Sequence, residues 1–340
     1  MALTGTPTAD DFNISNRRYI GGKSLLVKHI FDLVPTSRKR GTFLDVFAGT
    51  GVVAEGALGS FDHLILNDLL FSNNTIYQGF FGKGNFSRSK LESFRRMANS
   101  TRASKLPTNY FDRHFGGKFF SRSAARMIGF LREQIKDGDF TKREKFILVA
   151  SLIYSADRIA NTVGHYEAYR KKEATFKPFV FRLIKPRRDV SADIFREDSN
   201  ELVRRVIADV AYVDPPYNSR QYSRFYHVLE NLTKWEKPEL EGVALKPPLE
   251  NLSKYCTVNA PEAFEDLIRN LNAKFIIVSY NNTYDSKSTS SQNKITLEEI
   301  EIILKSKGRT QIKQLEHKFF NSGKTDFKNH KEYLFITESR

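Results

Sequence analysis

The residues with the clearest chemical potential are Asp214-Pro215-Pro216-Tyr217, which follow the short apolar stretch 210–213. Two prolines cannot continue a central strand, so the chain stiffens and turns where the strand ends. The motif brings a carboxylate, the Pro215 carbonyl and an aromatic ring close together. A planar base that carries an amino group fits this arrangement. Its amino group has two N–H donors for the two oxygens, and the π face of the base can stack on the Tyr217 ring. A rigid loop that holds a core tyrosine is the structural alternative.

A second candidate site is the run from Asp45 to Gly51, which lies between a predicted strand and a predicted helix. Its glycines allow a tight turn and a close approach of the backbone to a ligand. Asp68 ends the next predicted strand, where a carboxylate can accept hydrogen bonds from a ribose diol. With Ala54, the run also fits a dinucleotide-binding fingerprint, so a nicotinamide dehydrogenase is an alternative function. A simple glycine turn, with Asp68 as a helix cap, is the structural alternative.

The hydrophobic pattern around these motifs predicts strands that alternate with helices, which is typical of a parallel α/β sheet. Two polar or proline-containing stretches, 237–255 and 281–294, predict long functional loops. The predicted strands are 42–47, 63–67, 176–184, 210–213, 275–280, 311–319 and 333–337. The predicted helices are 52–58, 87–98, 123–135, 142–159, 199–206 and 297–305, with Ser199 as a possible cap of the fifth.

A basic, mostly helical stretch from 81 to 189 interrupts the alternation and indicates an inserted domain. Between positions 83 and 126, eleven Lys and Arg stand against two acidic residues, with aromatic residues interleaved. The whole chain carries 54 Lys and Arg against 39 Asp and Glu, a formal charge of +15. Cations beside flat apolar rings are typical of nucleic-acid binding, although a solvated basic face over an aromatic core would give a similar pattern.

Together the two motifs resemble the adenine-specific DNA methyltransferase family. The segment Arg18-Tyr19-Ile20-Gly21-Gly22-Lys23 is similar to a further cofactor motif of that family, an aromatic residue followed by Gly-Gly-Lys. The motif order matches the Dam-like subgroup, in which the recognition domain separates the cofactor motifs from the catalytic motif. The resemblance covers about 17–338. It implies a Rossmann-like methyltransferase sheet, 15–80 and 190–340, with a mostly helical target-recognition insert, 81–189.

The resemblance also implies roles for individual residues. Asp214, Pro215, Pro216 and Tyr217 form the catalytic pocket, and Asp214 also borders the cofactor. Asp68 holds the cofactor's ribose, and Asp198 or Glu197 reaches its adenine, with a helix cap as the alternative role for Asp198. The other implied cofactor-binding residues are Tyr19, Gly22, Lys23, Asp45, Phe47, Gly49 and Gly51. The stretch 279–282 resembles a motif that borders the target base, and 161–169 resembles a stretch near the DNA in some members.

The implied activity moves the methyl of S-adenosylmethionine to the 6-amino group of an adenine flipped out of duplex DNA. The resemblance implies the modification enzyme of a restriction–modification system, with double-stranded DNA as partner and a separate endonuclease. We expect a monomer without metal, because the seven histidines show no metal-binding spacing. A single cysteine and the absence of a long apolar run or signal segment predict a bacterial cytoplasmic protein. An RNA adenine methyltransferase, a DNA-binding specificity protein and a protein glutamine methyltransferase are the alternatives.

Overall fold

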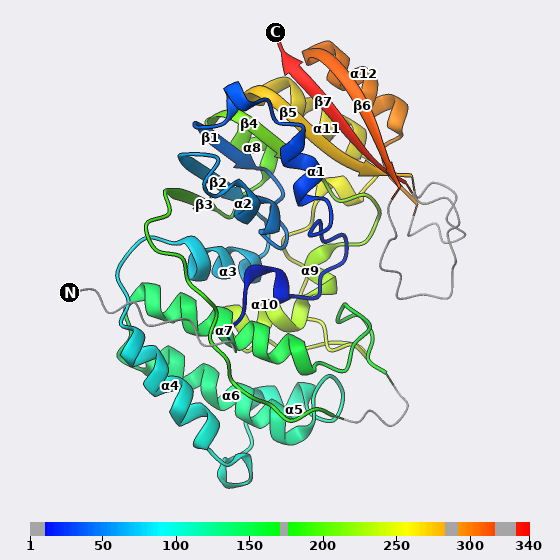
Figure 1. The fold of residues 1–340 in the computed structure, drawn as a ribbon. Coiled ribbons are helices and arrows are strands. Elements are labelled where there is room, and N and C mark those ends of the chain that lie inside the picture. The colour runs from blue at the N-terminus through cyan, green and yellow to red at the C-terminus, as the bar shows by residue number, and fades with distance from the viewer. Residues whose placement is uncertain (1–10, 171–175, 283–291, 317–330) are drawn as a thin grey trace, which may run out of the picture. The chain divides into compact units, whose positions relative to one another are not determined.

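Seven strands form one sheet in the order β3-β2-β1-β4-β5-β7-β6 (Figure 1). The computed structural model describes residues 11–170, 176–282, 292–316 and 331–340. Strands β1 to β5 are parallel, and β7 runs antiparallel to both β5 and β6. The predicted α/β sheet is therefore confirmed. The strands are β1 Thr42–Asp45, β2 His63–Asn67, β3 Ala192–Phe195, β4 Ile207–Val213, β5 Asn272–Asn281, β6 Gly308–Glu316 and β7 Lys331–Ser339.

The chain divides into two compact units. The sheet unit comprises 20–70, 191–225 and 249–340, and the helical unit comprises the chain up to residue 19, 71–190 and 226–248. The helices of the sheet unit are α1 Val27–Asp32, α2 Val52–Ala57, α8 Ser199–Val203, α9 Tyr222–Phe225, α11 Ala260–Asn270 and α12 Leu297–Lys307, with 3-10 turns at Thr36–Arg38 and Lys254–Cys256.

Alternation along the strands gives the sheet two apolar faces, because successive side chains of a strand point to opposite sides. Leu44 and Ala211 join a buried cluster with Leu267 of α11 and Leu304 of α12. The neighbouring Phe43 instead packs against Phe31 and Phe61, with ring centroids 5.5 and 5.1 Å away. The sheet is thus buried on both sides, as a parallel sheet requires.

The order of the strands reverses between β1 and β4, which makes this the switch point of the sheet. These two strands are parallel neighbours, with Asp45 opposite Tyr212. Their carboxyl ends therefore meet at one edge. The segment that begins with Val46 and the motif that begins with Asp214 both leave the sheet there, where open α/β sheets bind ligands.

The helical unit is larger than the predicted insert 81–189, and the predicted domain bounds 15–80, 81–189 and 190–340 stay a prediction. Segments 71–80 and 226–248 were expected in the sheet domain but pack with the helices. The Glu230 carboxylate accepts the backbone N–H groups of Phe71 and Ser72 at 2.9 and 2.7 Å. Asn231 donates to the Tyr110 hydroxyl at 2.9 Å. The helices are α3 Phe71–Phe81, α4 Arg88–Ser100, α5 Tyr110–Phe115, α6 Arg122–Asp137, α7 Lys142–Ile159 and α10 His227–Lys234, with 3-10 turns at Ile14–Asn16 and Ala103–Lys105.

The strand predicted over 176–184 is wrong, because its backbone groups bond to a helix instead of a neighbouring strand. The N–H groups of Arg182 and Ile184 donate to the hydroxyls of Ser155 and Ser151 on α7, both at 3.0 Å. Within the described residues, the one contact of this stretch that resembles strand pairing is an isolated bridge between Ile184 and Phe12. The 311–319 strand appears as β6, although 317–319 lie outside the described residues.

Candidate active site

Lys23, Asp214 and Tyr217 converge at the switch point of the sheet. The Lys23 Nζ lies 3.1 Å from Asp214 Oδ1 and hydrogen-bonds the Tyr217 hydroxyl, which in turn donates to the same Asp214 oxygen. The ammonium also lies 4.8 Å from the centre of the Tyr217 ring. The contacts that the described residues make to Asp214 all involve its Oδ1 atom. The Oδ2 atom is therefore the oxygen available to an amino group. Pro215 is buried and Pro216 half-buried, as expected of a stiff turn.

Glu332 on β7 completes this group, and sequence reasoning missed it. Its Oε1 lies 3.0 Å from Lys23 Nζ and accepts a hydrogen bond from the Ser279 hydroxyl at 2.7 Å. The residue is 2% exposed. A Glu directly before the apolar run Tyr333-Leu334-Phe335-Ile336 is the one signal that could have marked it.

Burial and charge set the protonation of this group. Burial raises the pKa of Asp214 to about 6, and the Lys23 ammonium opposes the increase while the charge of Glu332 adds to it. Burial lowers the pKa of Lys23, but the charges of Asp214 and Glu332 outweigh burial and raise it overall. Burial, with the charges of Asp214 and Glu332, raises the pKa of Tyr217 well above its ordinary value. At neutral pH the site therefore holds the ionised Asp214 carboxylate, the Lys23 ammonium and the neutral Tyr217 phenol.

Two neighbouring residues shape the other side of the catalytic motif. The Tyr280 ring stands edge-on to Tyr217, with centroids 5.0 Å apart. The carbonyl of Tyr217 accepts the N–H of Lys294 at 2.8 Å. The predicted base-bordering stretch 279–282 thus contributes Ser279 and Tyr280 to the site, whereas 283–291 of the predicted loop lie outside the described residues.

The glycine-containing turn after β1 has the conformation that its sequence predicts. Gly49 and Gly51 have φ of 52° and 79°, in the left-handed region that favours glycine. Asp68 after β2 accepts the N–H groups of Gly49 and Leu70 at 3.0 and 2.8 Å, one with each carboxylate oxygen. Phe47 is half-buried and packs edge-on against Tyr255 at 5.0 Å.

Asp45 is a buried carboxylate, and no group in the described residues makes a normal hydrogen bond to either of its oxygens. It is 1% exposed. Burial raises its pKa well above the ordinary value, and the charges of Asp214 and Asp68 add to the increase, while the Ala54 amide lowers it. A buried and unsatisfied carboxylate is costly, so it marks a place for a cationic or hydrogen-bond-donating ligand. The ammonium and ribose hydroxyls of S-adenosylmethionine fit Asp45 and Asp68, and the positive-φ glycines leave the backbone open beside them.

Two further predicted cofactor residues, Asp198 and Glu197, have structural partners of their own, and a third, Gly22, is exposed. Asp198 caps α8 by accepting the N–H of Asn200 at 2.8 Å, so the cap is Asp198, one residue before the predicted Ser199. Glu197 pairs with Arg205. Gly22 is exposed and directly precedes Lys23. A cofactor contact by Asp198 or Glu197 therefore stays a prediction.

Tyr19 belongs to the helical unit, where it takes part in an aromatic stack. Its ring lies parallel to that of Tyr226 at 4.7 Å, with the Arg17 guanidinium 5.0 Å from its centre. Its hydroxyl accepts a hydrogen bond from Asn73 at 3.3 Å.

In the stretch 161–169, the buried Tyr166 hydroxyl donates to Asp157 at 2.9 Å. These contacts give both segments structural roles, while their predicted roles at the cofactor and the DNA stay predictions.

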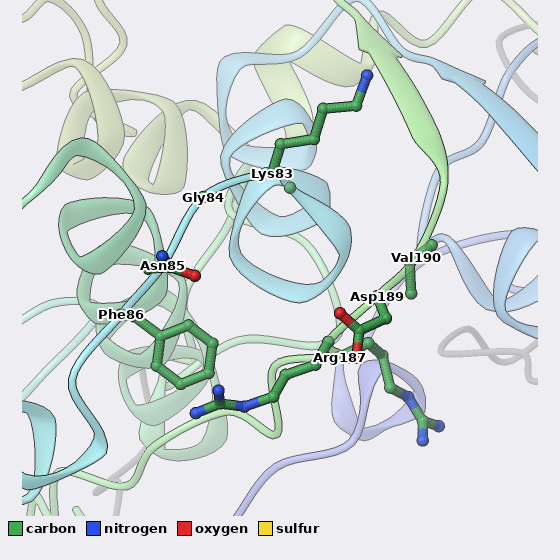
Figure 2. Close-up of a pocket in the computed structure, with 9 residues that line it drawn as sticks. Lys83, Gly84, Asn85, Phe86, Arg187, Asp189 and Val190 are labelled. Atoms are coloured by element: carbon green, nitrogen blue, oxygen red, sulfur yellow. The ribbon is translucent and has the colours of Figure 1, made fainter.

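The helical unit contains a cavity of about 290 Å³ between two loops (Figure 2). Three cationic side chains and one acidic side chain contribute to its wall, and the Arg188 guanidinium lies 4.6 Å from the centre of the Phe86 ring. Gly84 turns the first loop with a φ of 102°. The cavity is lined by Gly82, Lys83, Gly84, Asn85, Phe86, Arg187, Arg188, Asp189 and Val190.

In the described part of the chain, no group of three or more His, Cys, Asp or Glu residues could hold a metal ion. No described helix combines the length and apolar composition needed to cross a membrane.

Comparison with known proteins identifies what the chain resembles. A family profile described as D12 class N6 adenine-specific DNA methyltransferase matches residues 19–286. Modification methylase StsI from Streptococcus sanguinis is 33% identical over 78% of this chain and 44% of its own length. Type II methyltransferase M.NlaIII from Neisseria lactamica is 27% identical over 94% of this chain and 98% of its own length. Type II methyltransferase M.CviAII from Paramecium bursaria Chlorella virus 1 is 30% identical over 94% and 97%. The chain thus spans less than half of StsI but nearly all of the other two relatives.

Proposed function

This chain belongs to the D12 class N6 adenine-specific DNA methyltransferase family, and we propose that it methylates the 6-amino group of adenine in double-stranded DNA. The observation that carries the proposal is the buried group around Asp214, at the switch point of a methyltransferase sheet. The relatives are modification and type II methyltransferases, which supports a role as the modification enzyme of a restriction–modification system. A separately acting endonuclease and a monomeric state belong to the same proposal.

The amino nitrogen of adenine is a poor nucleophile, because its lone pair is delocalised into the ring. Asp214 Oδ2 and the Pro215 carbonyl accept its two N–H bonds, which favours a pyramidal nitrogen with a localised lone pair. The Tyr217 ring stacks on the base and replaces the stacking that the base loses when it leaves the duplex. Fixing the nitrogen in this way supplies the positional part of the rate enhancement.

When bound, S-adenosylmethionine supplies an electrophilic methyl group on a sulfonium. Asp45 would hold its ammonium, Asp68 its ribose hydroxyls, and Gly49 and Gly51 would allow the backbone to pass beneath it. Asp214 stabilises the positive charge that develops on the nitrogen and is in position to accept the proton that the nitrogen then releases. Its raised pKa of about 6 leaves it ionised at pH 7 and basic enough for that transfer.

The basic cavity of the helical unit supports DNA as the partner. Lys83, Arg187 and Arg188 offer charge to a phosphate, and the Gly84 turn offers close backbone approach. The variant with Lys83→Ala and Arg188→Ala should bind duplex DNA more weakly at all sequences. In a plot of the logarithm of the binding constant against the logarithm of the salt concentration, the slope should decrease in magnitude by about one for each lost phosphate contact. Lys136→Ala on α6, which is also exposed, is the matched control.

The test of the proposed function is transfer of labelled methyl to unmethylated duplex DNA, with single-stranded DNA and RNA in parallel, followed by nucleoside analysis. The expected result is label in N6-methyladenine from duplex DNA, lost in Asp214→Asn. Label found only in RNA would overturn the substrate. Protein that binds the methyl donor but labels no nucleic acid would overturn the activity.

A further inference from the structure

We propose that two segments of the helical unit, the turn 116–122 and the loop 161–170, together form a surface that reads the sequence of the DNA, and that Asn161 is the positioning residue that holds them together. The inference rests on the proposed function. This surface differs from the cavity of Figure 2, because none of the residues that line the cavity lies in either segment.

The Asn161 side chain joins the two segments. Its Nδ2 donates to the carbonyls of Lys118 and Arg170, both at 3.0 Å. Its backbone N–H donates to the Phe119 carbonyl at 2.8 Å, and its carbonyl accepts the N–H of Arg170 at 3.4 Å. One residue thus fixes the backbone that carries two cationic side chains, Lys118 and Arg170.

Buried aromatic rings support this surface from below. Phe119 and Tyr166 are both buried, and the Phe119 ring packs against Tyr166 and Tyr169 with centroids 5.7 and 5.4 Å away. An antiparallel bridge between Thr162 and Tyr169 closes the loop. A site that must discriminate between similar ligands needs such support, because a loosely held side chain adapts to the wrong one.

The charges of the two segments suit a polyanion. Arg122 and Arg170 are exposed and Lys118 is half-buried. Among the described residues no carboxylate pairs with any of these three cations, whereas Glu167, the one acidic residue in the two segments, pairs with Lys246 at 2.7 Å. The two segments therefore present positive charge to the phosphates of a duplex.

A neighbouring histidine responds to this charge. Burial lowers the pKa of His114, and the charges of Arg113 and Lys118 lower it further. The imidazole is therefore neutral at pH 7. A potential that disfavours a further cation at this place favours the approach of DNA.

Charge alone would hold DNA of any sequence, and the fixed backbone is what favours base readout. Contacts to phosphates orient a protein on DNA but carry no sequence information. A well-placed guanidinium can donate two parallel hydrogen bonds to O6 and N7 of a guanine in the major groove. Arg122 directly follows Ser121, whose hydroxyl caps α6 by accepting the N–H of Ala124 at 3.1 Å. Arg170 is held by Asn161, so both guanidinium groups extend from fixed backbone.

The experiment treats unmethylated genomic DNA with wild-type protein and variants, and maps the methylated adenines by single-molecule sequencing. The variants are Asn161→Ala and the double variant Arg122→Lys with Arg170→Lys. The measured quantity is the ratio of kcat/KM for the mapped site to that for duplexes with one base pair changed. Binding to duplex DNA of unrelated sequence is measured in parallel.

Asn161→Ala should reduce this ratio about tenfold, because both segments lose their common hydrogen bonds. The lysine variant keeps both charges but loses the planar forks. It should reduce the ratio about tenfold to a hundredfold while binding unrelated DNA within about threefold of wild type. The matched control is Arg96→Ala with Lys136→Ala, two exposed cations of the same unit. Lys136 lies at the other end of α6, about 21 Å along the helix from Arg122, and this variant should keep the wild-type ratio.

Three results would overturn the proposal. Wild-type protein that methylates adenine in duplex DNA without sequence preference has no reading surface. An unchanged ratio in the lysine variant would limit the two arginines to phosphate contacts. An unchanged ratio in an Asn161→Ala protein with a cooperative melting transition would remove the positioning role. If Asn161→Ala does not fold, the lysine variant decides, since it changes exposed side chains only. Failure of the proposed function is a separate outcome, because wild-type protein would then methylate no adenine in duplex DNA.

Discussion

Replacing Lys23 with methionine removes the ammonium from between two buried carboxylates while keeping most of the side-chain volume. At 3.1 Å and an effective dielectric constant of about 20, the attraction between Lys23 and Asp214 is about 5 kcal/mol. That value is an upper bound, because water enters the vacated space. Measured effects of one adjacent opposite charge on a carboxyl pKa are about 1 to 3 units.

An increase of about 2 units, the middle of that range, moves the Asp214 pKa from about 6 to about 8 in Lys23→Met. The sign follows from the contact, because the ammonium stabilises the ionised carboxylate and its loss favours the protonated form. At pH 7 the ionised fraction then falls from about nine-tenths to about one-tenth, so kcat should fall about tenfold. Activity should return towards the wild-type plateau as the pH approaches 9.

The assay is label transfer from S-adenosylmethionine to unmethylated duplex DNA at saturating substrates, in short incubations between pH 5.5 and pH 9.5. Lys28→Met is the matched control, since its ion pair with Asp32 is exposed at 81 and 59% and lies on neighbouring α1. A Lys23→Met protein with an unmoved acidic limb near pH 6 and a raised KM for the methyl donor would refute the reasoning. Lys23 would then serve the cofactor alone.

Three further changes test other parts of the structure. Gly51→Ala should cost about 1–2 kcal/mol of unfolding free energy in denaturant titrations, because its φ is 79°, and should raise the KM for the donor. Gly59→Ala has the same strain at φ 78° and should cost the same stability without the KM effect. Asp45→Asn should weaken donor binding about tenfold by calorimetry, while the melting temperature of the free protein stays equal or rises, since the carboxylate lacks a normal hydrogen bond. Tyr166→Phe should lower the unfolding free energy by about 1–3 kcal/mol, because Asp157 loses a buried donor, and unchanged stability would contradict that estimate.

The motifs at the ends of β1 and β4 could be predicted from the sequence, because local features determine them. A buried apolar run followed by glycines or prolines marks a strand end, and the carboxyl ends of parallel strands meet at one edge. Helix α7 and strand β2 match their predicted bounds, Lys142–Ile159 and His63–Asn67, for the same reason. The family resemblance is confirmed by the profile match over 19–286.

What the sequence did not reveal depends on contacts between distant segments. Lys23 meets Tyr217 across 194 positions, and Glu332 joins them only because β7 lies beside β5. The extended stretch 176–184 has strand-like composition, but serines on α7 satisfy its backbone groups.

Among the elements that were not predicted, three have local explanations. Helix α3 is buried on most of its surface and shows little amphipathic pattern. Strand β3 has only four residues. Helix α11 has a proline at its start, which is a signal of a helix N-terminus, although this helix was not predicted.

The order of the last three strands has a consequence for how the protein matures during synthesis. Strand β7 follows β6 in the chain but lies between β5 and β6 in the sheet. While a ribosome is still making 331–339, the partner edge of β5 is open and β6 has no neighbour in the sheet. Glu332 arrives with that same strand. A nascent chain that already contains the cofactor turn and the catalytic motif therefore still lacks its full charge arrangement. Until β7 is added, β5 is an open edge of the sheet, and an open edge is a site for unwanted strand pairing.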